Sequence, residues 1–232
     1  MKKFMMIAAM MVAAVSAKAQ FEPGTFSIQP KAGFSVTWLS NMEDISINLP
    51  GLGTVLDLEK TPIAGALLGV EAEYQLANKF SLAAGVNYSL QGSGWKDYEI
   101  KIAGETGKIE DSKIELGYVT IPVTANYYLF KGFAVKAGVQ FGFMTNASFK
   151  ATTKEKSDGS EVKTEYDEKW KDKFDKFDIS IPMGVSYQFK VPIVLDLRYN
   201  LGLTKVNKES EDGHKDLKNN VIQLTVGYKF AL

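Results

Sequence analysis

Two ionisable residues of opposite charge, Asp196 and Arg198, lie two positions apart in the apolar stretch IVLDLRYNLGLT, residues 193–204. Side chains two apart share one face of an extended strand. An acid and a base placed in this way could serve as an active site or as part of a proton path. Five more charged residues lie in similar apolar segments: Lys31, Glu71, Glu73, Lys136 and Lys229. Their role depends on the elements that carry them.

The composition excludes several kinds of site. The chain has 232 residues, a formal net charge of zero and no cysteine, which argues against nucleic-acid partners, disulfides and thiolate chemistry. Its one histidine, His214, lies in the charged segment KESEDGHKDLKNN, where we expect a solvated loop. Neither a phosphate-binding glycine loop nor a metal-ligand spacing is present. The sequence therefore predicts no catalytic residue, no metal site and no cofactor, and a protein that is not an enzyme.

The N-terminal segment MKKFMMIAAMMVAAVSAKAQ has the pattern of a secretory signal peptide. Two lysines precede an apolar run over 4–15, and a small-x-small site follows at 17–19. The apolar run is too short to span a membrane as a helix. We therefore predict a signal peptide over 1–19, export of the chain, and a mature domain over 20–232.

Alternation of apolar and polar residues recurs along the whole mature chain and predicts β-strands. Each alternating segment is about as long as a tilted strand that crosses a bilayer. The eight segments are 28–39, 63–76, 80–92, 117–129, 133–146, 178–189, 193–204 and 221–232.

The connections between these segments alternate strictly between short and long. Short connections lie at 77–79, 130–132 and 190–192, and long ones at about 40–62, 93–116, 147–177 and 205–220. In an up-and-down sheet this pattern places all short turns at one end. The sequence therefore predicts an all-β fold: an eight-stranded antiparallel up-and-down transmembrane β-barrel with short periplasmic turns and four long extracellular loops.

Glycine indicates which face of the strands lies inside the barrel. A glycine within a strand costs roughly 0.5–1 kcal/mol, which an open water-exposed face does not offset, whereas a narrow lumen needs small residues. The glycines of the polar face are Gly33, Gly65, Gly69, Gly85, Gly138, Gly142, Gly184, Gly202 and Gly227. The polar face is therefore expected to line the lumen, which favours a membrane barrel over a soluble lipocalin-like barrel.

The seven charged residues share this polar face and lie near the short-turn end of their strands. One charge that faces lipid at mid-bilayer costs about 2–4 kcal/mol, so seven would exceed the roughly 5–15 kcal/mol stability of an ordinary domain. We therefore expect them to point inward. They would form a buried layer of paired charges that fills the lumen, with a gate or proton path as the alternative.

Aromatic residues gather on the apolar face close to the short turns, where they are expected to form a girdle at one membrane interface. The residues of this predicted girdle are Tyr74, Phe80, Tyr127, Phe133, Phe189, Tyr228 and Phe230.

The segment YVTIPVTANYYLF (118–130), followed by a tight Lys-Gly turn, resembles the PorT-like outer membrane β-barrel family of Bacteroidetes. The segments QPKAGFSVTWL, FDISIPMGVSYQF and IQLTVGYKF are similar to other strands of that family. The resemblance covers residues 20–232. It implies an outer-membrane barrel and no particular activity. The link of the named member with type IX secretion is not carried over to this chain.

The expected function follows from the barrel. We predict a protein of the outer membrane of a Gram-negative bacterium, surrounded by lipid and lipopolysaccharide, with a structural or interaction role and protein partners at its extracellular loops. The segment 147–177 is expected to be a solvated, mobile loop. Within it, EYDEKWKDKFDKFD (165–178) could instead extend the hairpin above the membrane or form a short amphipathic turn at the surface. A narrow channel and a soluble ligand-binding barrel are the alternative functions.

Overall fold

The computed structural model describes residues 22–49, 53–102, 105–157, 160–208 and 216–232. The predicted signal peptide and His214 lie outside these ranges. Within them, no helix is long and apolar enough to cross a membrane.

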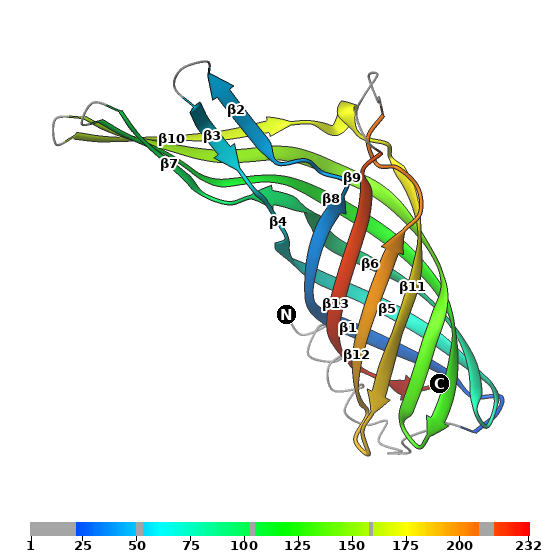
Figure 1. Cartoon of the computed structure of the whole chain (residues 1–232). Helices are drawn as coiled ribbons and strands as arrows, with labels where there is room; N and C mark the ends of the chain where they lie inside the picture. Colours follow the sequence, from blue (N-terminus) through cyan, green and yellow to red (C-terminus); the bar gives the residue numbers. More distant parts are fainter. Residues whose placement is uncertain (1–21, 50–52, 103–104, 158–159, 209–215) are drawn as a thin grey trace.

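Eight antiparallel strands close into a barrel, as the sequence predicts (Figure 1). Each strand pairs with the next along the chain, and β13 pairs with β1 to close the ring. The barrel strands are β1 (Phe26–Ser40), β5 (Ile63–Ala77), β6 (Phe80–Trp95), β8 (Glu105–Phe130), β9 (Phe133–Ser157), β11 (Phe177–Gln188), β12 (Ile193–Gly202) and β13 (Lys218–Tyr228).

Polar side chains line the lumen and apolar ones face outward. In β12, for example, Asp196 and Arg198 are buried, whereas Leu195 and Leu197, which alternate with them, are exposed. The most exposed large apolar side chain of the wall is Phe34, at 76%. A soluble lipocalin-like barrel needs the reverse arrangement, with its apolar face inside, so that alternative is wrong.

The inward glycines allow close approach between neighbouring strands. A Cβ placed on Gly33, Gly138 or Gly184 would collide with a backbone carbonyl oxygen of the adjacent strand. The space is therefore taken by backbone as well as by lumenal side chains, and glycine lets the sheet curve into a narrow barrel.

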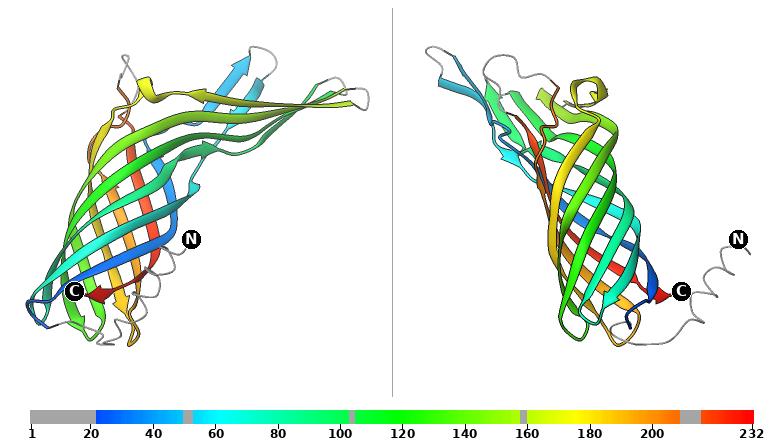
Figure 2. Two further views of the ribbon diagram at one scale, coloured as in Figure 1. Left: turned by 180° about the vertical axis from the view of Figure 1, so that it is seen from behind. Right: turned by 90° about the vertical axis from the view of Figure 1, so that its right-hand side faces the viewer.

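Two barrel strands continue far beyond the wall at the long-loop end. β8 and β9 join β7 (Tyr98–Ile102) and β10 (Ser160–Lys169) in a four-stranded extension, here called the blade, which projects to one side of the barrel (Figures 1 and 2). The expectation of a loop over 147–177 is therefore wrong, because strands cover 147–157 and 160–169. Of the segment 165–178, the first part extends the hairpin as β10 to Lys169, and a short turn at Lys171–Lys173 follows. Regular antiparallel pairing satisfies the backbone polar groups of these segments.

The remaining elements are short. β2 (Ile45–Leu49) and β3 (Gly53–Leu58) form a separate hairpin, and β4 (Lys60–Thr61) pairs with β6. A single 3-10 turn, η1 (Lys171–Lys173), follows β10, and β14 (Phe230–Ala231) pairs with the start of β1.

Candidate functional site

The carboxylate of Glu71 is the centre of a charged network in the lumen. Lys31 Nζ from the neighbouring strand β1 lies 2.6 Å from Glu71 Oε2. Lys136 Nζ from β9 lies 2.9 Å from Glu71 Oε1, and Arg198 Nη2 from β12 lies 3.1 Å from Oε2. Since β9 and β12 are not neighbours of β5, these contacts cross the lumen.

Asp196 joins the same network from β12. Its Oδ2 lies 2.7 Å from Lys136 Nζ and 3.3 Å from Arg198 Nη2. Two carboxylates therefore share three cations, and five of the seven predicted residues form one connected group.

The other two predicted residues, Glu73 and Lys229, form a second group, closer to the short turns than the first. Lys229 Nζ lies 2.7 Å from Glu73 Oε2. The other carboxylate oxygen, Glu73 Oε1, accepts hydrogen bonds from Tyr128 Oη at 2.6 Å and Ser81 Oγ at 2.7 Å. Asn126 Nδ2 in turn donates to Ser81 Oγ at 3.1 Å. The polar chain therefore continues from the ion pair onto β6 and β8.

Tyr128 and Ser81 were missed by sequence reasoning. Tyr128 lies in the segment ANYYLF between two outward aromatic or apolar residues, and its phenol ring suggested no lumenal role. The signal was its position in the period of two: Tyr128 follows Thr124 and Asn126 at intervals of two residues and so lies on the same, polar side of β8.

All seven predicted residues are buried, with at most 7% of any residue exposed. Four are basic and three are acidic, so opposite charges nearly balance. Removing charges from water is unfavourable, and the attraction compensates only when each charge has partners with good geometry. Both oxygens of Glu71 and both of Glu73 are occupied, which leaves these carboxylates poorly placed to transfer a proton to a substrate.

Besides the charged network, a group of apolar side chains closes the lumen at the long-loop end. Its buried side chains come from the end of β1, from the middle of β8 and β9, and from the segments after η1 and β12. They are Leu39, Met42, Ile114, Leu116, Tyr118, Met144, Ala147, Phe174 and Val206. These residues are here called the mouth cluster. The rings of Phe149 and Trp170, with centroids 4.7 Å apart, stack on each other and pack against it. An apolar cluster across the mouth excludes water from this end of the barrel.

The predicted girdle residues lie on the outer face next to the short turns. Tyr74, Tyr127 and Phe189 are exposed, whereas Phe133, Tyr228 and Phe230 are half-buried among their neighbours. Phe133 stacks on Phe130 at a centroid distance of 4.8 Å. Contact of this ring of aromatic residues with a membrane interface stays a prediction.

The blade has one charged face and one less polar face. Residues paired directly across strands share a face, so Lys108 and Lys154 lie together, and Glu110 lies two residues along from Lys108. Lys154 Nζ lies 2.6 Å from Glu110, which also pairs with Lys108. Hydrogen bonds from these two lysines lower the pKa of Glu110 to about 2.

The opposite face of the blade carries Tyr98, Ile109, Val162 and Tyr166. Val162 is 59% exposed and Tyr166 is 47% exposed. No group of His, Cys, Asp and Glu that could hold a metal ion occurs in the described part of the chain.

Comparisons with known proteins agree with this architecture. A family model described as an outer membrane protein beta-barrel domain matches residues 18–208. No curated protein matches the chain.

Among solved structures, the chain is similar to OprG of Pseudomonas aeruginosa, with 15% identity, coverage of 93% of this chain and 100% of that chain, and a TM-score of 0.43. It is also similar to Ail of Yersinia pestis in complex with the heparin analogue sucrose octasulfate, with 13% identity, coverage of 90% and 99%, and a TM-score of 0.40. Neisserial surface protein A is similar at 15% identity, with coverage of 89% and 97% and a TM-score of 0.39. Likenesses this distant carry no inference about activity.

Proposed function

Because the chain belongs to the outer membrane protein beta-barrel family, we propose that it is a non-conducting barrel of the outer membrane that acts through its extracellular blade. The lumen then has a structural role, and the blade presents a binding surface outside the cell. Stability and recognition are thereby assigned to different parts of the same sheet.

The double closure of the lumen is the observation that carries this proposal. The charged network around Glu71 joins β1, β5, β9 and β12 near the periplasmic end, and the mouth cluster lies at the extracellular end. An ion on its way through would have to break paired charges and then enter an apolar region, and both steps are unfavourable. The proposal therefore excludes steady ion flow in the resting barrel.

The blade supports the interaction role through its continuous strand pairing and its two unlike faces. β8 and β9 pair continuously from the barrel wall into the blade, apart from local bulges. Exposed Val162 and Tyr166 lie on one face, while ion pairs of Glu110 lie on the other. A preformed surface of this kind binds with little ordering cost. We propose an extracellular protein as the partner, with lipopolysaccharide as the alternative outcome of the test.

Planar-bilayer recording tests the first half of the proposal. The purified full chain should give no single-channel currents above those of protein-free bilayers. A variant that lacks 98–109 and 152–165, each replaced by an Asn-Gly turn, keeps the mouth cluster and should also be silent. Reproducible conductance from the intact chain would support the narrow-channel alternative instead.

Photo-crosslinking from intact cells tests the second half. A photoreactive residue at position 162 or 166 should capture one discrete extracellular species, whereas the same residue at lipid-facing position 222 should not. Capture of lipopolysaccharide alone would mean that the partner is this lipid and not a protein. Equal labelling from all three positions would contradict a specific blade surface.

We also propose that the chain falls within the PorT-like group of outer-membrane barrels. Support comes from the segment 118–130, in which Tyr118 and Pro122 both lie buried on the lumenal side of β8. A phylogeny of barrel sequences tests this placement. The proposal fails if the chain branches outside the Bacteroidetes members.

A further inference from the structure

At the extracellular rim of the barrel, the pairing between β1 and β5 ends at Pro62. β1 pairs with β5 only as far as Thr37 opposite Ile63. Pro62 lacks an N–H group and cannot continue the ladder with β1. The chain before it pairs with β6 instead, with Thr61 opposite Gly94. A cleft of about 390 Å³ therefore opens between 38–41 on one side and 60–62 on the other.

The lining of this cleft combines an aromatic ring with polar groups. Trp38 is stacked nearly parallel to Tyr199, with ring centroids 6.1 Å apart and planes 14° apart. Lys60 Nζ donates to the carbonyl oxygen of Met42 at 2.9 Å and retains two further N–H donors. The backbone N–H of Lys60 donates a hydrogen bond to Asp44 Oδ1. A ring held in place beside hydroxyl, amide and ammonium groups suits a ligand with one apolar face and many hydroxyls, as in a sugar.

The cleft lies where the wall leaves the membrane. Val36 and Phe34 precede Trp38 on the same outward face of β1, and they are 47% and 76% exposed. Tryptophan at the end of such an apolar stripe is typical of the headgroup level. A saccharide carried by an outer-leaflet lipid would therefore reach the cleft from the side.

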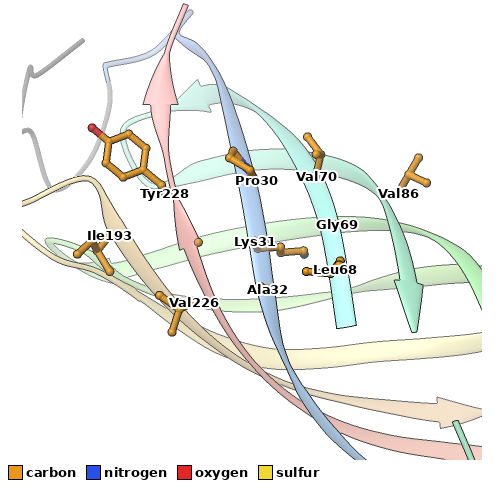
Figure 3. Close-up of a pocket in the computed structure, with 11 residues that line it drawn as sticks. Pro30, Lys31, Ala32, Leu68, Gly69, Val70, Val86, Ile193, Val226 and Tyr228 are labelled. Carbon is orange, nitrogen blue, oxygen red and sulfur yellow. The ribbon is translucent and has the colours of Figure 1, made fainter. Parts of the chain in front are cut away.

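Below the cleft, the same strand pair offers a path for an acyl chain. β5 places Ala64 opposite Val36 and Ala66 opposite Phe34, so small side chains lie beside large ones. Farther down, a shallow, open hollow lies over Ala32 of β1 and Leu68 of β5 (Figure 3). Its other lining residues include Pro30, Val70, Val86, Ile193, Val226 and Tyr228.

The distance in depth between the cleft and the hollow is close to the thickness of one leaflet. Trp38 lies six positions after Ala32, or about 20 Å along a strand at roughly 3.3 Å per residue. A strand tilted by about 45° spans about 14 Å of depth over that length, close to half of the roughly 30 Å hydrocarbon core.

We propose that β1 and β5 together form a binding site for one glycolipid of the outer leaflet. The saccharide headgroup occupies the cleft at Trp38 and Lys60, and an acyl chain follows Ala64 and Ala66 toward the hollow at Ala32. This site lies on the barrel wall and is independent of the blade, so its failure would leave the proposed function untouched.

Native mass spectrometry of the full chain in detergent micelles tests the proposal. The probes are a defined lipid A bearing inner-core sugars and, separately, phosphatidylethanolamine. The chain should retain one lipid A under conditions that strip phosphatidylethanolamine. Trp38→Ala should weaken lipid A binding by about five- to tenfold, as loss of one aromatic contact does. Phe143→Ala, an exposed aromatic on β9, should bind as the original chain does.

Ala66→Phe provides a second variant, which fills the path of the acyl chain without altering the cleft. It should weaken lipid A binding, while a soluble inner-core saccharide still quenches the fluorescence of Trp38, measured with Trp95→Phe and Trp170→Phe added so that Trp38 is the single tryptophan. Heat-modifiable migration on a gel verifies that each variant is folded. Equal retention of both lipids, or lipid A binding unchanged by both Trp38→Ala and Ala66→Phe, would overturn the site.

Discussion

Glu71 and Arg198 are separated by 127 positions in the chain, yet Arg198 Nη2 lies 3.1 Å from Glu71 Oε2. Their strands, β5 and β12, have β1 and β13 between them in the ring, so the pair reaches across the lumen. Apolar side chains face outward in this barrel, and polar contacts of this kind therefore occupy the place of a hydrophobic core. The stability of the barrel should depend on them.

Loss of the lumenal carboxylates should destabilise the barrel strongly. In Glu71→Ala/Glu73→Ala, Lys31, Lys136 and Arg198 lose Glu71 and Lys229 loses Glu73, and breaking a buried pair costs about 3–5 kcal/mol. Urea unfolding from lipid vesicles, followed by tryptophan fluorescence, measures the change. Glu59→Ala in the exposed pair with Lys96 is the control and should cost less than about 1 kcal/mol. Equal losses in both variants would refute the role of the network.

Tyr128→Phe should lower the free energy of unfolding by about 1–3 kcal/mol, because the 2.6 Å hydrogen bond to Glu73 is lost inside the lumen. The adjacent Tyr127→Phe is a matched control, since Tyr127 is exposed on the outer face. Vesicle-based unfolding of the two variants side by side gives the comparison. A larger effect at Tyr127 would mean that the hydroxyl of Tyr128 contributes little.

Leu116→Ala should loosen the mouth cluster and cost about 2–5 kcal/mol, because Leu116 is fully buried there. It should not produce ion conductance, since the network around Glu71 remains intact. Leu68→Ala on the lipid-facing wall should cost clearly less. Unfolding and bilayer recording of the same preparations check both statements; currents from Leu116→Ala would show that the mouth cluster alone closes the lumen.

Gly138→Ala should impair folding, because the added methyl group would meet the carbonyl oxygen of Val123. Overpacking of this kind costs typically 1–3 kcal/mol. Gly107 in the blade has open space around its Cα, so Gly107→Ala should fold as the original chain does. The folded fraction on a heat-modifiability gel distinguishes the two. Normal folding of both variants would exclude a steric role for Gly138.

Glu110 in the blade should titrate with a pKa of about 2 instead of its ordinary value near 4.5. A lowered carboxyl pKa means that its ion pairs stabilise the blade fully above pH 4.5 and lose this contribution as the pH falls through about 2. Carboxyl ¹³C chemical shifts against pH measure it directly. Lys154→Met removes one hydrogen-bond donor and should move the pKa upward, whereas Lys96→Met, which removes the partner of Glu59, should leave it unchanged.

Most of the barrel could be predicted from the sequence because its pattern repeats. Alternation in eight segments and the sequence of short and long connections define an up-and-down ring, and the inward direction of Asp196 or Glu71 follows from the energetics of charge in lipid. The extents of β8 and β9 could not be predicted. Their blade segments, such as 105–116, mix charged and apolar residues and carry bulges, which hide the period of two.

The sequence by itself determined which residues enter the lumen, because the phase of a strand depends only on local alternation. Which of them meet was decided by the tertiary structure: the tilt and stagger of the strands bring Lys136 onto both Glu71 and Asp196, and Tyr128 onto Glu73. The mouth cluster and the cleft at Pro62 also arise only there. They depend on how separate strands are placed relative to one another, and no local pattern encodes that relation.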